Sequence, residues 1–195
     1  MTGPRGDTRQ RVLDTALTLF ADRTYGATTL QDIADAMGVT KAALYYYFRT
    51  KDEILTALIE PSTVALEELL DRAESRPPAP AVTRDVLVGL GELSARDRRR
   101  LGIMMFDRTF VYDEALGKRS RAGQERLQRV LTRGLDDDPD AEVRVLAALA
   151  ALAVPFVALQ TREDPRPIIR PAVAAACAVL GIRPPRRDPA SEQPL

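Results

Sequence analysis

The chain has 195 residues, and its 28 basic and 28 acidic side chains give a formal net charge of zero at pH 7. Histidine, the commonest acid–base residue of enzymes, is absent. The single cysteine, Cys177, excludes an internal disulfide and has no histidine to activate it for thiol catalysis. We therefore expect no enzyme, with no catalytic residue, no metal site and no cofactor. The polar start of the chain lacks an apolar signal-peptide core, which favours a cytoplasmic protein with no membrane segment.

Helical periodicity begins near the N-terminus. Apolar residues from about Thr8 to Asp22 recur at helical spacing and predict a first helix that buries one face. That face comprises Val12, Leu13, Ala16, Leu17 and Phe20. The next stretch, residues 29–39, predicts a second amphipathic helix with the apolar residues Leu30, Ile33, Ala34 and Met37. Gly38 then supplies a tight turn, because glycine takes a left-handed conformation without steric cost.

Residues 40–51 predict a helix that follows this turn. Thr40 is placed as its N-cap, because a threonine hydroxyl can accept a hydrogen bond from a free N–H of the first turn. At about 100° per residue, one side packs against the preceding helix and comprises Ala43, Leu44, Tyr47 and Phe48. The opposite side faces outward and comprises Lys41, Ala42, Tyr45 and Tyr46. The two helices and their turn read as a helix–turn–helix that presents side chains to the major groove of DNA.

The outward side suits double-stranded DNA. Lysine can donate to a guanine edge or a phosphate, tyrosine hydroxyls can donate to phosphates, and a small residue permits close approach. We expect four residues at the groove: Lys41, Ala42, Tyr45 and Tyr46. Four more are expected near phosphates: Thr29, Thr40, Tyr47 and Lys51. The alternative is that the three consecutive tyrosines are half-buried aromatics of an ordinary amphipathic helix.

The charge around this segment is balanced. Residues 1–60 carry seven bases against eight acids. The positive potential must therefore be local, and it comes from residues 40–51 and from the basic residues Arg5, Arg9 and Arg11. We expect a protein that binds specific DNA sites with only modest affinity for other sequences.

Residues 8–60 resemble the N-terminal DNA-binding domain of TetR-family transcriptional repressors. The similar stretches are residues 16–20 (ALTLF), 25–29 (YGATT), 33–39 (IADAMGV), 43–48 (ALYYYF) and 51–55 (KDEIL). One departure is Tyr47, where the family often carries histidine; tyrosine keeps an aromatic hydrogen-bonding group there. The resemblance implies a homodimer that binds a pseudo-palindromic operator, represses transcription, and releases DNA when a small molecule binds its C-terminal domain.

The remainder of the chain predicts further helices and no strand, so the expected fold class is all-α. Thr50 and Glu53 form a capping box that opens a helix, and Pro61 predicts a break or kink in it. Asp140 is placed as the N-cap of a later helix. We expect a DNA-binding domain at 1–50, a linking helix starting at 50–60, a regulatory and dimerisation domain at 61–182, and a disordered tail at 183–195.

Two alanine-rich helices near 140–160 and 168–181 are expected to form the dimer. The apolar residues of the first are Val143, Leu146, Ala147, Ala150, Val154, Val157 and Ala158. Those of the second are Ile169, Ala172, Val173, Ala176 and Leu180. Small residues permit close helix approach, and this much apolar surface favours a partner helix. The alternative is that both helices complete the core of the monomer.

The effector site is expected in the middle third, roughly 82–133. Methionines and aromatics cluster there and suit an adaptable pocket for a small apolar or aromatic molecule. The candidates are Met104, Met105, Phe106, Phe110 and Tyr112. Such a cluster is also typical of a plain helical core. A second hypothesis for the function therefore stays open: a DNA-binding regulator without a small-molecule effector, controlled by a protein partner or by its abundance.

Overall fold

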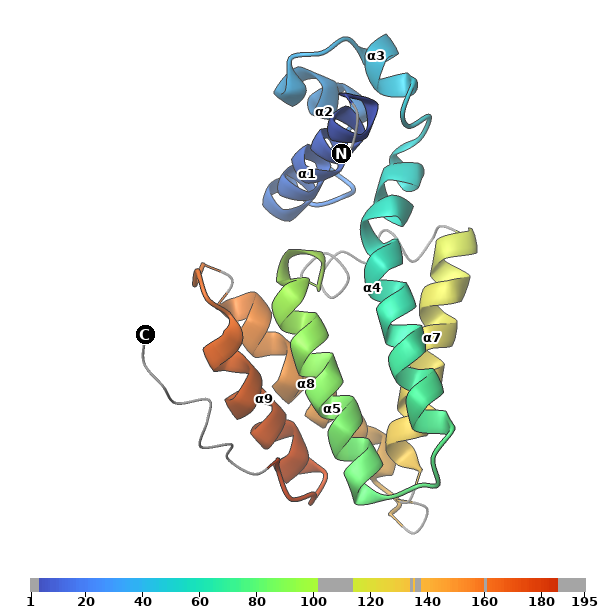
Figure 1. The fold of residues 1–195 in the computed structure, drawn as a ribbon, viewed down its shortest axis with the longest axis vertical. Coiled ribbons are helices and arrows are strands. Elements are labelled where there is room, and N and C mark those ends of the chain that lie inside the picture. The colour runs from blue at the N-terminus through green and yellow to red at the C-terminus, as the bar shows by residue number, and fades with distance from the viewer. Residues whose placement is uncertain (1–3, 102–113, 134, 136–137, 160, 186–195) are drawn as a thin grey trace. The chain divides into compact units, whose positions relative to one another are not determined.

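The computed structural model describes residues 4–101, 114–133, 135, 138–159 and 161–185. Every regular element in these ranges is an α-helix, which confirms the all-α fold class (Figure 1). Residues 186–195 of the expected disordered tail lie outside the described residues. So do all the candidate effector residues, which are Met104, Met105, Phe106, Phe110 and Tyr112.

Contacts within the chain define two compact units. The first comprises Met1–Glu68 with Arg96–Arg126, and the second comprises Leu69–Ala95 with Leu127–Leu195. Each unit is discontinuous in sequence, whereas the division expected from the sequence is a simple succession along the chain. One boundary between the units falls inside a long helix, α4, that spans Lys51–Glu74.

The first unit holds the N-terminal helices, α1 (Pro4–Arg23), α2 (Leu30–Met37), α3 (Lys41–Tyr45) and the first part of α4. α1 therefore begins at Pro4, earlier than the predicted start at Thr8. One hydrophobic core joins these helices, and its fully buried members include Val12, Ala16, Ile33, Ala34, Leu44, Ile54 and Leu55. Leu17, expected inside, is only partly buried against this core. The burial comes from the 3.6-residue periodicity of each helix, as the sequence predicts.

The start of α4 is capped by its own sequence. The backbone N–H of Glu53 donates to the Thr50 hydroxyl at 3.1 Å, which is the expected first half of a capping box. The Glu53 carboxylate accepts from the N–H of Arg49 at 2.7 Å rather than from that of Thr50. Of the break or kink predicted at Pro61, the break is wrong, because α4 continues through this residue to Glu74. A proline inside a helix removes one backbone hydrogen bond, and neighbouring side chains stabilise the helix on both sides of it.

Arg119 on α7 (Glu114–Thr132) is one such neighbour, and it lies in the same unit. Its guanidinium binds the carboxylates of Glu60 and Glu67, both at 2.8 Å, so it connects the turns of α4 before and after Pro61. The hydrogen bonds to Glu67 and then to Glu60 raise the pKa of Arg119 above its ordinary value. Ser62, directly after Pro61, connects α4 to a second segment, because its hydroxyl donates to the Asp97 carboxylate at 2.8 Å.

The second unit is built from the end of α4, α5 (Pro80–Arg96), the end of α7, α8 (Ala141–Ala158) and α9 (Arg166–Val179). α8 and α9 pack closely against each other (Figure 1). The buried residues of α8 are Val145, Ala148, Leu152 and Phe156. Those of α9 are Ile168, Ala172, Val173, Ala176 and Cys177. Cys177 is thus a core residue, and burial raises the pKa of its thiol.

The dimer residues expected from the sequence divide between two environments. Those on α8 face outward: Val143, Leu146, Ala147, Ala150, Val154 and Ala158 are exposed, and only Val157 is half-buried. On α9 the situation is reversed, because Ala172, Val173, Ala176 and Leu180 are buried inside the unit and Ile169 is half-buried. The monomer core therefore uses the apolar side of α9, whereas α8 carries two apolar sides and buries one of them.

Arg144, near the start of α8, connects this helix to the end of α9. Its guanidinium donates to the carbonyl of Val179, at 3.1 Å through Nε and 3.0 Å through Nη2, near the C-terminus of α9. It also binds the Asp138 carboxylate at 2.5 Å. The N–H of Asp140 and then Arg144 lower the pKa of Asp138. Asp140 occupies the predicted N-cap position of α8, but its side chain makes no capping hydrogen bond.

Candidate nucleic-acid interface

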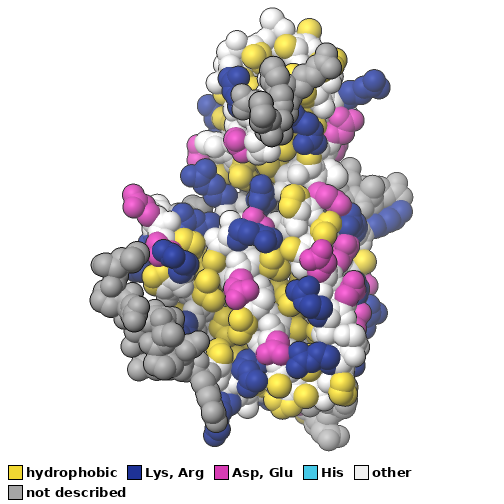
Figure 2. Space-filling view, in the orientation of Figure 1, with side chains coloured by type: hydrophobic (Ala, Val, Ile, Leu, Met, Phe, Trp, Pro, Cys, Tyr) yellow, Lys and Arg dark blue, Asp and Glu magenta, His cyan; other side chains and the backbone are white. Residues whose placement is uncertain are grey.

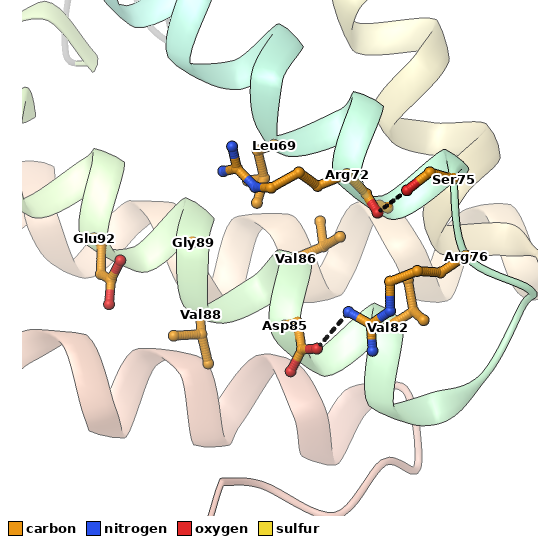
Figure 3. A pocket seen from close by; sticks show the side chains of 11 residues that line it. Leu69, Arg72, Ser75, Arg76, Val82, Asp85, Val86, Val88, Gly89 and Glu92 are labelled. Carbon is orange, nitrogen blue, oxygen red and sulfur yellow. Dashed lines mark hydrogen bonds and ion pairs between the residues drawn. The ribbon is translucent and has the colours of Figure 1, made fainter.

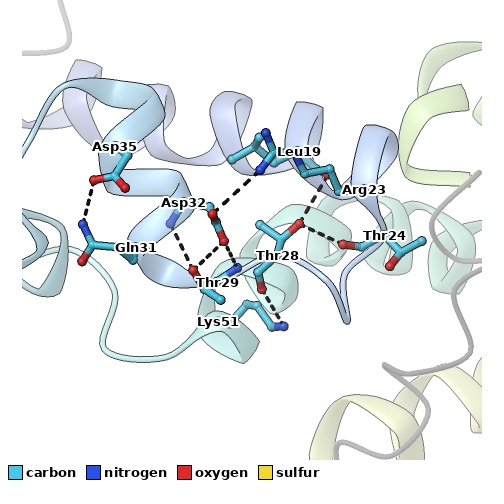
Figure 4. A network of polar contacts seen from close by, with 9 residues as sticks. All are labelled: Leu19, Arg23, Thr24, Thr28, Thr29, Gln31, Asp32, Asp35 and Lys51. Carbon is cyan, nitrogen blue, oxygen red and sulfur yellow. Dashed lines mark hydrogen bonds and ion pairs between the residues drawn. The ribbon is translucent and has the colours of Figure 1, made fainter.

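The helix–turn–helix expected from the sequence is formed by α2 and α3. Thr29 caps α2 by accepting a hydrogen bond from the N–H of Asp32 at 3.1 Å (Figure 4). The Asp32 carboxylate in turn accepts from the N–H of Thr29 at 2.8 Å, which completes the capping box. At the other end Gly38 is left-handed, with φ 66°, and the N–H of Val39 donates to the carbonyl of Ala34. These local bonds end α2 sharply and direct the chain into α3.

α3 is short, and its faces are well separated. Thr40 caps it by accepting from the N–H of Ala43 at 3.2 Å, as predicted. Leu44 and Phe48 are buried in the core, and Tyr47 is half-buried. Ala43, expected to pack inward, is exposed. Regular helix ends at Tyr45, and a turn held by the N–H groups of Tyr47 and Phe48 on the Leu44 carbonyl continues to residue 48.

The outward side of α3 presents the four residues expected at the groove. Lys41 and Ala42 are exposed, Tyr45 is 42% exposed and Tyr46 is 68% exposed. The Lys41 ammonium lies 5.6 Å from the centre of the Tyr45 ring, so the cation rests near an aromatic face. Tyr46 meets Tyr47 edge to face, with 5.1 Å between ring centres. The result is an exposed surface of one cation, one small residue and two phenols.

The residues expected near phosphates differ in their surroundings. Thr29 and Thr40 are exposed residues whose hydroxyls cap α2 and α3. Tyr47 is half-buried beside Tyr46. Lys51 is half-buried, and its ammonium donates to the carbonyls of Tyr25 and Thr28, at 2.7 and 2.8 Å. The local sequence around Lys51 does not predict these hydrogen bonds, because the two carbonyls belong to residues 26 and 23 positions earlier in the chain.

Arg49 is a residue that the sequence reasoning left out of the site. It is exposed directly after the buried Phe48, and its backbone is fixed by the Glu53 carboxylate. Arg9 and Arg11 on α1 are exposed too, and the Arg9 guanidinium lies 4.9 Å from the centre of the Phe48 ring. The sequence feature that could have identified Arg49 is its position between α3 and Thr50, the N-cap of α4.

Charge on the surface is mixed. On the face seen in Figure 2, Lys and Arg side chains alternate with Asp and Glu side chains. Within the helix–turn–helix the acidic side chains have polar partners. Asp35 accepts a hydrogen bond from Gln31 at 2.7 Å, and the Asp32 carboxylate lies 3.8 Å from the Arg23 guanidinium. The hydrogen bonds from Thr29, followed by Arg23, lower the pKa of Asp32. The outward side of α3 contains no acid. The attraction to a polyanion is therefore local, as the charge count predicts.

A separate cleft of about 480 Å³ lies between the end of α4 and α5, inside the second unit (Figure 3). Its apolar lining comprises Leu69, Ala73, Val82, Val86, Val88 and Gly89. Arg72 and Glu92 add opposite charges, and at one end Arg76 binds Asp85 at 2.8 Å. Such a mixture of apolar surface and a few polar groups is typical of small-molecule sites. Within the described part of the chain, no cluster of three or more acidic or cysteine side chains is arranged to hold a metal ion.

Comparison with known proteins agrees with this geometry. The sequence model of the family described as "Bacterial regulatory proteins, tetR family" matches residues 12–58. That range contains the core of the first helices, the α2–α3 motif and the first turns of α4. Over residues 12–58 the chain matches the TetR family. The resemblance seen in the sequence is thereby confirmed.

The curated relatives of this chain that follow are transcriptional regulators. It is 35% identical over 100 residues to the HTH-type transcriptional regulator AcrR of Shigella flexneri, over 50% of this chain and 46% of the relative. It is 43% identical over 63 residues to the HTH-type transcriptional repressor KstR2 of Rhodococcus jostii, over 30% of this chain and 31% of the relative. The chain thus spans less than half of the length of these relatives.

Solved structures share the fold along nearly the whole chain. The ketosteroid transcriptional regulator KstR2 of Mycobacterium tuberculosis superposes with a TM-score of 0.72 at 19% identity, covering 93% of this chain and 95% of that one. AibR, solved in complex with isovaleryl coenzyme A and operator DNA, gives a TM-score of 0.66 at 22% identity, covering 91% and 99%. At these identities the likeness shows the fold of this chain.

Proposed function

We propose that this protein is a cytoplasmic transcriptional regulator that binds a pseudo-palindromic DNA operator as a homodimer, represses transcription, and is released by a small-molecule effector. The observation that carries the proposal is the acid-free, exposed side of α3, with Lys41, Tyr45 and Tyr46 held outward by a helix that is anchored through Leu44. An exposed cation and phenols on a rigid helix can donate to base edges and phosphates.

The DNA contacts are assigned from this geometry. Lys41, Ala42, Tyr45 and Tyr46 read the major groove, because they are the exposed residues of α3 and its following turn. Thr29, Thr40 and Tyr47 are our candidates for phosphate contacts, and we add the exposed Arg49. A helix this short exposes few side chains, so one copy reads only a few base pairs. Two copies about one DNA turn apart double the contacts and give the operator its two-fold symmetry.

The outward apolar side of α8 supports the homodimer. Val143 is 67% exposed, Leu146 is 56% exposed and Val154 is 44% exposed. Their spacing places them on one side of the helix, together with the small residues Ala147 and Ala150. A two-fold axis would bring the outward apolar side of α8 in a second copy against the same side in the first. The small residues would let the two helices approach closely.

Membrane insertion of α8 is the rival interpretation of the same stripe. By length and composition α8 could span a membrane, and among the described residues it alone passes this test. Its other side, however, is buried at Val145, Leu152 and Phe156, and the helix packs closely against α9, as in the core of a globular domain. A partner copy that covers the exposed stripe accounts for both sides at once.

Effector binding rests on the cleft between α4 and α5. Its volume of about 480 Å³ falls within the range of small-molecule sites. Its lining favours a small apolar or aromatic molecule, and the candidate residues Met104, Met105, Phe106, Phe110 and Tyr112 remain proposals for the same role. An effector would act by binding the DNA-free state more tightly than the DNA-bound state. The alternative function, regulation by a protein partner or by abundance without an effector, predicts that no small molecule changes DNA affinity.

The experiment selects DNA from a random duplex library with the full-length protein and sequences the bound fraction. An enriched inverted repeat is expected, and binding should be lost in the Lys41→Ala/Tyr45→Ala double variant. Enrichment of no sequence by the wild-type protein would overturn the proposal. Leu146→Glu should yield monomers by sedimentation, with Ala122→Glu on the exposed side of α7 as the matched control. Ala176 is unsuitable for this test, because it is fully buried inside the monomer.

A further inference from the structure

Lys51, the first residue of α4, is held by the turn between α1 and α2. Its ammonium donates to the carbonyl of Tyr25 at 2.7 Å. It also donates to the carbonyl of Thr28 at 2.8 Å (Figure 4). The same nitrogen lies 4.1 Å from the centre of the Tyr25 ring. A lysine ammonium has three donors and favours an aromatic face, so this environment matches its chemistry closely.

The turn that receives Lys51 is itself tightly constrained. Thr28 is fully buried, and its hydroxyl donates to the carbonyl of Thr24 at 2.9 Å. Thr24 has a φ of 73°, in the left-handed region that a threonine rarely adopts. Tyr25 is buried against Phe20, with 5.1 Å between ring centres, and its phenol donates to the Asp52 carboxylate. The first two residues of α4 thus bind both the backbone and the phenol of this turn.

The turn leads directly into the helix–turn–helix. Thr29, the N-cap of α2, follows Thr28 in the chain, so the position of the Thr28 carbonyl sets where α2 begins. α2 in turn carries α3 through the Gly38 turn. If the Lys51 ammonium moved to a DNA phosphate, it would leave the carbonyl of the buried Thr28 without this donor.

We propose that Lys51 is a positioning residue: it fixes the 24–28 turn against the start of α4, and it supports DNA binding through the placement of α2 and α3. This inference rests on the proposed function. It replaces the expectation from the sequence that Lys51 contacts a phosphate. Through the turn and α2, Lys51 would then connect α4 physically to α3.

The experiment compares Lys51→Met with the wild-type full-length protein. Methionine keeps an unbranched apolar stem and removes only the ammonium. In the absence of DNA, hydrogen exchange should be about tenfold faster at the backbone amides of residues 28–33 and unchanged in α8. Leu58→Val, which loosens the same hydrophobic core without altering the Lys51 ammonium, serves as the matched control and should not produce this local pattern.

The second measurement is the salt dependence of binding to a 40-base-pair duplex of random sequence, at a temperature where every variant is fully folded. Loss of a phosphate contact lowers the slope of log K against log salt by about 1. Lys51→Met should instead weaken binding several-fold with an unchanged slope. A reduced slope with unchanged exchange at residues 28–33 would show a direct phosphate contact and overturn the inference, as would unchanged affinity.

The two proposals can fail separately. If the wild-type protein binds no DNA, the proposed function fails, while hydrogen exchange still tests whether Lys51 holds the turn. If the protein binds DNA and exchange at residues 28–33 is the same in both proteins, the positioning role fails and the regulator function stands.

Discussion

Thr29 and Asp32 cap each other across the first turn of α2. The Thr29 hydroxyl accepts from the N–H of Asp32 at 3.1 Å, and the Asp32 carboxylate accepts from the N–H and the hydroxyl of Thr29, at 2.8 and 2.5 Å. These bonds favour the ionised carboxylate, and they lower the pKa of Asp32 from its ordinary value. The cap therefore links the stability of the helix–turn–helix to pH.

The first prediction concerns this link. Because the folded pKa of Asp32 is depressed, its contribution to the free energy of unfolding is present above the ordinary carboxyl pKa and is lost as pH falls through the lowered value. Asp32→Asn should lower the urea midpoint at pH 7 and reduce the loss of stability between about pH 5 and pH 2. Asp35→Asn, on the same helix, is the control. Equal acid sensitivity of Asp32→Asn and the wild-type protein would contradict the role of the cap.

Gly38 provides the second prediction. Its φ of 66° lies in the left-handed region, and a Cβ there would meet no atom within 4 Å. The cost of Gly38→Ala is therefore purely conformational, about 1 kcal/mol in the free energy of unfolding. Gly38→Asn should cost less, since asparagine adopts this conformation more readily. Chemical denaturation measures both; equal costs for the two variants would point to a lost contact instead.

The third prediction concerns the contact of α4 with α5. A Cβ on Gly89 would lie 2.7 Å from Leu69 Cδ1, so Gly89→Ala must displace a buried side chain. In a Leu69→Ala background the same change should stabilise the protein by up to about 1 kcal/mol, through higher helix propensity. A double-mutant cycle should therefore give a coupling of about 1 kcal/mol or more. Gly123→Ala, with its nearest neighbour Leu66 at 3.7 Å, is the control and should be stabilising without any second change.

The fourth prediction separates DNA binding from stability. Tyr46 is 68% exposed, so Tyr46→Ala should change the free energy of unfolding by less than about 0.5 kcal/mol. Its affinity for the selected operator should nevertheless fall by about 1–3 kcal/mol, as for a residue that contacts DNA. Arg129→Ala, an exposed cation on α7, controls for general loss of charge. Operator affinity that is equal in Tyr46→Ala and the wild-type protein would remove Tyr46 from the interface.

Local features of the fold follow from the sequence because their causes lie within a few residues. Thr29, Thr40 and Thr50 cap the helices where their positions predict, and Gly38 adopts the left-handed turn. The buried faces of α1 and α2 follow helical periodicity, with Leu17 only partly buried, since a 3.6-residue repeat gathers apolar residues on one side. The exposed side of α3 follows for the same reason.

Only the tertiary structure decides which of several similar apolar helix faces is buried and which distant residues a side chain contacts. It buries the apolar side of α9 and leaves the outward side of α8 open, although both helices are rich in alanine. It carries α4 through Pro61, where Arg119 from a distant segment binds both flanking turns. It also directs the Lys51 ammonium to carbonyls more than 20 residues away. Composition and periodicity fix the side of a helix on which a residue lies, whereas the partner on that side is set by contacts between segments far apart in the chain.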